Sequence, residues 1–178
     1  MIFGWSNYFS FISLYLTQVH HYTTMQTSLF LAVMGMGFSL GCGVLVDICT
    51  KKFDMNWVVV AGLLVTALAI LITLLAVSPT LDWFMVFVIG ASLSVAYSTL
   101  LAIFSNLVSN DEQGWVMGVT GSIMAICFGL TSLFTGVMAQ IGTGIPLILS
   151  IIGLTSSALL LGVFTVKKKY DGVGANDK

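Results

Sequence analysis

Few side chains in the sequence are of types that could carry out chemistry. His20 and His21 are adjacent, a spacing that does not place two imidazoles on one helix face around a metal ion. Cys42, Cys49 and Cys127 are too few and too widely spaced for a disulfide framework or a metal site. No serine–histidine set and no carboxylate pair falls within one apolar segment. The sequence therefore predicts no enzyme, no bound metal and no cofactor.

The composition indicates a membrane protein. Of the 178 residues, 58% are hydrophobic and only 7% are charged, whereas soluble domains carry about 25% charged residues. Such a chain cannot cover a water-exposed surface, which excludes an ordinary soluble enzyme and a disordered chain. The formal net charge is −1, with six lysines and no arginine, so no basic patch for nucleic acid is expected.

Six long apolar runs determine the predicted architecture. An α-helix rises 1.5 Å per residue, so about 20 apolar residues cross a hydrocarbon core about 30 Å thick. The runs are continuous rather than alternating, which favours helices over a barrel. We expect an all-α membrane protein with six transmembrane helices in residues 1–166 and a cytoplasmic tail, 167–178. The expected spans are 2–19, 27–46, 57–78, 83–107, 115–139 and 145–166.

Turn and cap residues support these limits. Ser109 and Glu112 have the spacing of a capping box before the fifth helix. Pro146 falls in the first turn of the sixth helix, where its missing N–H costs nothing. Pro79 is expected to close the third helix.

The lysines predict the orientation of the chain. With six spans, every lysine falls on one face, namely Lys51, Lys52, Lys167, Lys168, Lys169 and Lys178. The opposite face carries His20, His21 and Asp82 and no lysine. Because positive loops remain in the cytoplasm, we expect a cell (inner) membrane protein with both termini cytoplasmic.

Polar side chains on the first and fourth helices predict a cavity. In the first helix, Ser6, Ser10, Ser13 and Thr17 share a narrow arc bordered by Asn7 and Gln18. This face is expected toward water or the bundle, and the opposite face, including Trp5, Ile12 and Leu16, toward lipid. In the fourth helix, Ser94, Tyr97 and Ser98 repeat the pattern more weakly. The alternative is that each hydroxyl only bonds a carbonyl one turn back.

Small residues predict where helices pack closely. The fifth helix carries a stripe at spacings of three or four, which includes Gly114, Gly118, Gly121, Gly129 and Gly136. The second helix has small residues on two sides and is expected to be wedged between two neighbours. The third helix is almost wholly aliphatic and is expected to be a peripheral support.

The end of the second helix carries the most specific pattern. Gly43, Leu45, Asp47, Lys51 and Lys52 match the Gly-x-Leu-x-Asp signature loop of the major facilitator superfamily, which this sequence resembles. In the family, that loop joins the second and third helices of each six-helix half. Ile48 and Thr50 stand where the family usually has arginine and glycine, a degeneracy similar to that of the C-terminal half. Glu112-Gln113-Gly114 leads into the glycine-striped helix, like the eleventh helix of drug-efflux members.

The resemblance implies transport by alternating access, in which two six-helix halves rock about a central site. Asp47 would then serve as a conformational latch with Gly43, Lys51 and Lys52. A complete member has twelve helices, so the chain is expected to be a half or a fragment that works with an N-terminal half or a second copy. The neutral cavity face favours a small neutral or lipophilic solute. The alternative is a non-transporting membrane subunit or inactive remnant that acts only by packing against partners and lipid.

Overall fold

The computed structural model describes residues 1–76, 78–109 and 111–174, with side chains described except at 135, 136, 139 and 168–174. Every regular element in these residues is helical. In chain order the elements are α1 (Ile2–Val19), α2 (Thr24–Leu40), the π-helical turn η1 (Gly41–Leu45), α3 (Val46–Lys52), α4 (Met55–Ala76), α5 (Pro79–Asn106), α6 (Gln113–Ile141) and α7 (Ile145–Gly174). Because α2, η1 and α3 follow one another without a break, the elements form six rods.

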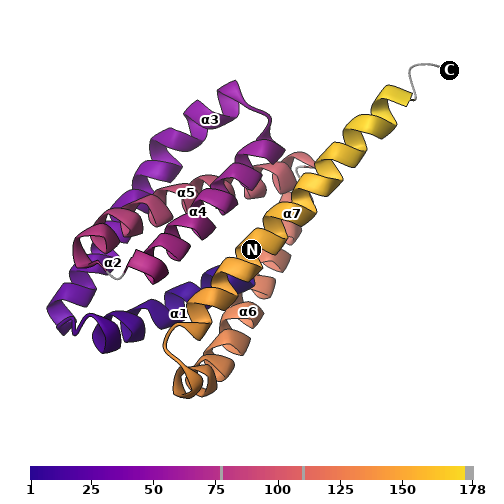
Figure 1. Cartoon of the computed structure of the whole chain (residues 1–178). Helices are drawn as coiled ribbons and strands as arrows, with labels where there is room; N and C mark the ends of the chain where they lie inside the picture. The colour runs from indigo at the N-terminus through magenta and orange to yellow at the C-terminus, as the bar shows by residue number, and fades with distance from the viewer. Residues whose placement is uncertain (77, 110, 175–178) are drawn as a thin grey trace.

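The rods pack into one bundle (Figure 1). Helix α5 lies between α2 and α4, helix α4 lies between α5 and α7, and α1 packs against α6 and α7. The core consists of large apolar side chains where these helices meet, including Tyr8, Phe11, Ile12, Leu16, Leu63, Ile70, Ile89 and Leu154. All-helical structure follows from the long apolar runs, because only a helix satisfies every backbone group within its own segment in lipid.

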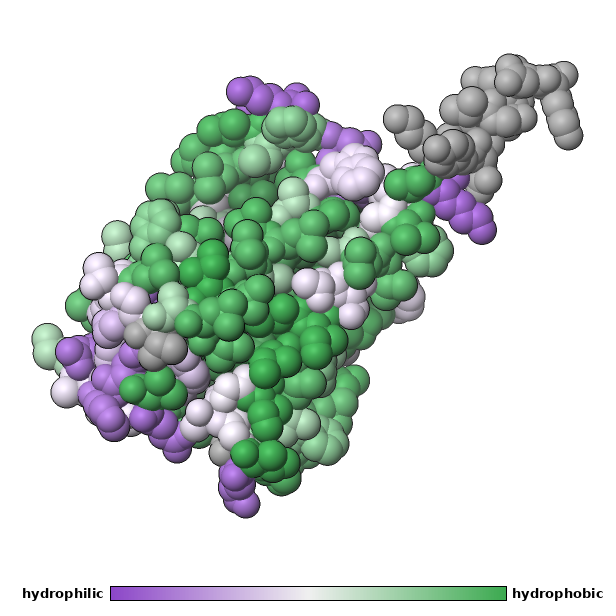
Figure 2. Space-filling model, in the orientation of Figure 1, coloured by the Kyte–Doolittle hydropathy of each residue, from purple (hydrophilic) through white to green (hydrophobic). Residues whose placement is uncertain are grey.

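Five of the described helical segments are long and apolar enough to cross a membrane. They are Thr24–Lys52, Met55–Ala76, Pro79–Asn106, Gln113–Phe134 and Ile145–Lys167. The visible face is hydrophobic over most of its area, with hydrophilic residues gathered toward the ends (Figure 2). The chain is thus a multi-pass membrane protein. Helix α1 has the predicted limits but is not among the five, since its serines, threonine, Asn7 and Gln18 lower its hydropathy.

Several helices extend beyond the predicted spans. The second rod continues to Lys52, and only Phe53 and Asp54 separate it from α4. Pro79 begins α5 instead of closing the helix before it, because proline fits the first turn where no N–H is needed. Pro146 lies in the first turn of α7, as predicted, and α7 continues to Gly174, into the segment expected as a tail.

Most of the apolar side of α1 is turned into the core, so the expectation that it faces lipid is wrong for Ile12 and Leu16, whereas Phe9 of the same face is exposed. Ile12 and Leu16 are 0% exposed. Trp5 is partly buried and packs against the core. The sequence period separates two faces of a helix, but lipid and a protein interior are equally apolar, so the pattern could not distinguish them.

Glycines permit the closest helix crossings. A Cβ on Gly37 would meet the carbonyl of Phe87, one on Gly90 would meet the carbonyl of Met34, and one on Gly41 would meet Ser94. These contacts join α2 and η1 to α5. Without a hydrophobic force between helices in lipid, such close backbone approach is what holds a crossing together.

Helix α4 is more than a peripheral support. Val59, Leu63 and Ile70 are buried against neighbouring helices, whereas Leu64 and Leu68 are exposed on its other side. Thr66 lies at the contact with α5, where its hydroxyl hydrogen-bonds that of Ser92 at 2.8 Å. An aliphatic helix can face either lipid or the protein core, so the sequence of α4 did not show which of its sides is buried. Tertiary packing determines that side.

Candidate functional site

The signature residues lie on one continuous rod rather than in a loop. The π-helical turn η1 contains Gly43, and α3 contains Asp47, Lys51 and Lys52. Single π-helical turns are rare and occur often at functional sites. A Cβ on Gly43 would meet no atom within 4 Å, so this face of the rod is open in the chain.

Asp47 and Lys51 form an ion pair within the predicted latch. The Lys51 Nζ lies 3.4 Å from the Asp47 Oδ2, and both side chains are largely exposed. An exposed pair of this kind stabilises a helix by only about 0–1 kcal/mol. The pairing of Asp47 with Lys51, one of the roles considered from the sequence, is therefore present and weak. Both groups remain accessible to another surface.

The polar residues of α1 fall into two groups. Ser6 and Asn7 are buried, and both donate hydrogen bonds to the Phe3 carbonyl at 3.0 Å. Ser6 also accepts a hydrogen bond from Thr131 of α6 at 2.8 Å. These contacts fix α1 against α6.

The remaining polar residues of α1 are more open. Ser10, Thr17 and Gln18 are exposed and Ser13 is half-buried. Thr17 donates a hydrogen bond to the Ser13 carbonyl at 2.8 Å, which is the back-bonding that the alternative interpretation expects.

The polar residues of α5 are also placed differently from one another. Ser94 is buried and donates to the Ala91 carbonyl at 2.9 Å. The Ser98 Oγ lies 3.2 Å from the Cys42 Sγ of η1. Tyr97 is half-buried and points toward α6, where its hydroxyl lies 3.9 Å from the Met124 sulfur. Tyr97 also lines a pocket.

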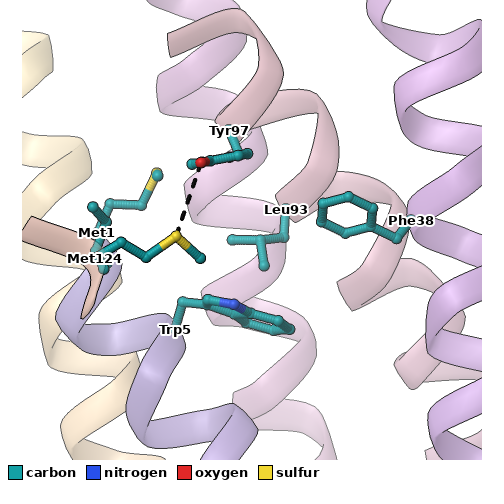
Figure 3. A pocket seen from close by; sticks show the side chains of 7 residues that line it. Met1, Trp5, Phe38, Leu93, Tyr97 and Met124 are labelled. Atoms are coloured by element: carbon teal, nitrogen blue, oxygen red, sulfur yellow. Dashed lines mark hydrogen bonds between the residues drawn. The ribbon is translucent and has the colours of Figure 1, made fainter. Parts of the chain in front are cut away.

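An apolar pocket forms where α1, α2, α5 and α6 converge, and we refer to it as the aromatic pocket (Figure 3). Its volume is about 50 Å³. The lining residues are Met1, Ile2, Trp5, Phe38, Leu93, Tyr97 and Met124. Trp5, Leu93 and Met124 point toward a common space, with the Tyr97 hydroxyl facing the Met124 sulfur across it. Leu93 and Tyr97 lie near the middle of α5.

The aromatic pocket suits contact with an uncharged, apolar ligand. None of its lining residues has an ionised side chain, and the one charged group that they carry, the Met1 α-ammonium, donates a hydrogen bond to Ser157. The indole, the phenyl ring and the phenol supply large rigid surfaces, and methionine sulfur adapts to the faces and edges of rings. Sequence periodicity indicated Tyr97 but missed Trp5, Phe38 and Met124, because these residues come from three different helices that only the fold brings together.

The glycine stripe of α6 faces open space in the chain. A Cβ on Gly114, Gly118, Gly121 or Gly129 would meet no atom within 4 Å. Gly136 lies in α6, but its surroundings fall outside the described residues. Trp115 and Leu133 on the same helix are more than 70% exposed. The stripe therefore packs against nothing within the described part of the chain and is available for a partner.

A buried ion pair at the other end of the bundle was missed by sequence reasoning. The His20 Nε2 lies 2.9 Å from the Asp82 Oδ2, and the two side chains are 3% and 0% exposed. Tyr15 and Tyr22 pack on the imidazole, at ring separations of 5.8 and 5.7 Å. The two residues are 62 positions apart in the sequence, so no local pattern joins them. Pro79 could have indicated this contact. A proline at the start of a helix would have placed Asp82 in the first turn of α5, at the same end of the bundle as His20.

The described residues contain no group of three histidine, cysteine, aspartate or glutamate side chains that could hold a metal ion. The geometry instead offers a neutral pocket, an open glycine face and an exposed charged segment on one helical scaffold.

Comparison with known proteins agrees with this arrangement. The sequence model of the Major Facilitator Superfamily matches residues 1–130, which include the signature residues and every residue of the aromatic pocket. No curated protein and no solved structure gives a significant match to the chain. Because the family match covers well over half of the 178 residues, the chain belongs to the major facilitator superfamily.

Proposed function

We propose that the chain forms one six-helix lobe of a secondary transporter and moves a small neutral or lipophilic solute by alternating access. The observation that carries this proposal is the aromatic pocket, in which Trp5, Phe38 and Tyr97 from three helices line an apolar hollow of about 50 Å³ that forms part of a larger site. Transporters of this kind bind solute near the bilayer midplane, between two halves. The mid-helix position of Leu93 and Tyr97 in α5 agrees with that depth.

The second lobe is an N-terminal six-helix half or a second copy of the chain. The open faces at Gly118 and Gly121 of α6 and at Gly43 of η1 supply surfaces for it. Small residues are the usual contact surface between membrane helices, since they let backbones approach closely. In this arrangement the aromatic pocket supplies one wall of the solute site and the second lobe supplies the other.

Asp47, Lys51, Lys52 and Gly43 act as a latch between the lobes. Their exposure and the weakness of the Asp47–Lys51 pair support this role, because little energy is lost when these charges change partner. The lysines at this end of the bundle support a cytoplasmic location for it and for both termini, in the cell (inner) membrane. Helix α1 crosses the bilayer with the others, since its buried side stabilises it against α6 and α7.

The proposal is tested by uptake of radiolabelled uncharged aromatic solutes into proteoliposomes. The chain is reconstituted alone and together with a supplied N-terminal six-helix half. Saturable uptake in either preparation supports transport. Absence of saturable uptake in both, with the protein shown to be folded by circular dichroism, contradicts it.

A second candidate function is a membrane subunit that only binds partner helices. The open glycine face of α6 favours it, because that face needs no solute to explain it. A tight complex with a partner helix bundle, combined with no solute uptake, is the outcome that would support this alternative.

A further inference from the structure

A second binding feature lies on the outer side of the bundle, away from the aromatic pocket. Helices α4 and α7 leave a groove of about 540 Å³ between them. Its walls include Val60, Leu64, Leu159 and Val163, and Gly162 deepens it. A Cβ on Gly162 would meet no atom within 4 Å. Leu64, Leu159 and Val163 are also exposed at the surface, so the groove opens sideways, where a membrane protein meets acyl chains.

One end of this α4–α7 groove differs from the rest. Lys167 and Trp57 line it there, and both are exposed. The two ion pairs among the described residues, His20–Asp82 and Asp47–Lys51, do not include Lys167. The nearest acid in sequence to Trp57 is Asp54, whose Oδ1 accepts a hydrogen bond from the Asn56 backbone N–H at 2.8 Å. Among the described side chains Lys167 has no ion-pair partner, so its ammonium group is available to a ligand that occupies the groove.

We propose that the α4–α7 groove binds one acyl chain of an anionic phospholipid from the surrounding bilayer, with the lipid phosphate on Lys167. The apolar walls of the groove suit an acyl chain, and Trp57 and Lys167 at its end suit the headgroup of the same phospholipid. Tryptophan rings prefer the level of the headgroups, and a lysine near an anionic lipid surface contributes about 1 kcal/mol. The proposal does not depend on transport.

A neighbouring groove provides a contrast within the same protein. It lies between α3, α4 and α5, has a volume of about 590 Å³, and shares Trp57 with the first groove. No lysine lines it. It can accept an acyl chain without any preference for the headgroup, whereas the α4–α7 groove should select an anionic one.

The test is lipid retention by the full chain, measured by native mass spectrometry in mild detergent. Phosphatidylglycerol and phosphatidylcholine with identical acyl chains are titrated in parallel, with inorganic phosphate as a separate competitor. The variants are Lys167→Gln, which removes the cation, and Gly162→Leu, which fills the groove at a position with room for a side chain. The matched controls are Lys52→Gln, an exposed lysine outside this groove, and Ala61→Leu, which fills the neighbouring groove.

The expected result is roughly a fivefold preference of the unaltered chain for phosphatidylglycerol. Lys167→Gln should lose that preference, Gly162→Leu should lose the retained lipid, and both controls should keep the preference. Equal retention of the two lipids by the unaltered chain overturns the proposal. So does a loss in Lys52→Gln as large as that in Lys167→Gln, because the effect would then reflect general charge. Displacement by inorganic phosphate at equal concentration also overturns it, since the site would then recognise phosphate without the lipid.

Discussion

The His20 Nε2 and the Asp82 Oδ2 lie 2.9 Å apart, and the two side chains have almost no exposure to solvent. The pair fastens the segment after α1 to the first turn of α5, at the end of the bundle opposite Lys52. Tyr22 extends the contact by stacking on Trp83 at a ring separation of 6.2 Å. Polar groups taken out of water are costly unless they have a partner, so each of the two residues depends on the other.

Replacement of either member of this pair should destabilise the protein strongly. Asp82→Ala leaves a buried imidazole without its partner, and His20→Ala leaves a buried carboxyl group without its partner, at a cost of about 1–3 kcal/mol each. The double variant should lose much less than the sum of the two. The measurement is a double-mutant cycle of melting temperatures in detergent, with the exposed neighbour in His21→Ala as the control. Additive losses would show that the two residues do not interact.

The crossing of α2 and α5 should tolerate no side chain at Gly90. Gly90→Ala places a methyl group against the Met34 carbonyl and forces the helices apart. Gly35→Ala lies on the same rod as Met34 but has no atom within 4 Å of the added carbon. The first variant should lower the melting temperature, and the second should leave it unchanged or raise it, because alanine favours helix over glycine by about 1 kcal/mol. Equal effects would argue against a close crossing.

A bulky side chain on the open face of α6 should weaken association with a second lobe without destabilising the fold of the chain itself. A Cβ at Gly121 meets no described atom within 4 Å, so Gly121→Leu should leave the melting temperature of the six-helix lobe unchanged or raise it, because leucine favours helix over glycine. Association with a second lobe should fall sharply, because a bulky side chain keeps the partner backbone at a distance. Crosslinking in mild detergent measures association. Unchanged crosslinking would show that the partner binds elsewhere.

The latch should affect transport more than stability. Asp47→Asn removes an exposed pair worth about 0–1 kcal/mol, so the melting temperature should barely change. Solute uptake in the reconstituted pair of lobes should fall, because the carboxylate no longer holds one conformation. Lys51→Gln is the matched change on the other side of the pair. A normal uptake rate in both variants would remove the latch from the proposal.

Substitution of two aromatic residues of α1, one inside the aromatic pocket and one outside it, should affect solute affinity differently. Trp5 lines the pocket, whereas Phe9, with its ring 5.6 Å away, is exposed outside it. Trp5→Ala should reduce the affinity for an aromatic solute at least about tenfold, since loss of a large buried ring costs more than 1.4 kcal/mol. Phe9→Ala should leave the affinity close to that of the unaltered chain. Equal binding by Trp5→Ala would move the solute site away from the pocket.

The sequence by itself determined the membrane class, the helical architecture and the family. Long apolar runs and a charged content of 7% leave few alternatives to membrane-spanning helices. The limits of α1 were predicted from the length of its apolar run, and the first-turn position of Pro146 was predicted because proline lacks an N–H that this turn does not need. The signature around Gly43 and Asp47 indicated the superfamily, since its residues are close together in the chain.

Only the tertiary structure decided which apolar faces are buried. Ile12 and Leu16 were expected to face lipid and lie in the core, since lipid and protein interior present the same hydropathy to a helix. Residues distant in sequence, such as His20 and Asp82 or Trp5 and Met124, come together only when helices cross. The periodicity of one helix indicates the face on which each side chain lies, but it does not identify the residues that contact that face. Those contacts determine whether a residue binds a ligand, packs in the core or pairs with another residue.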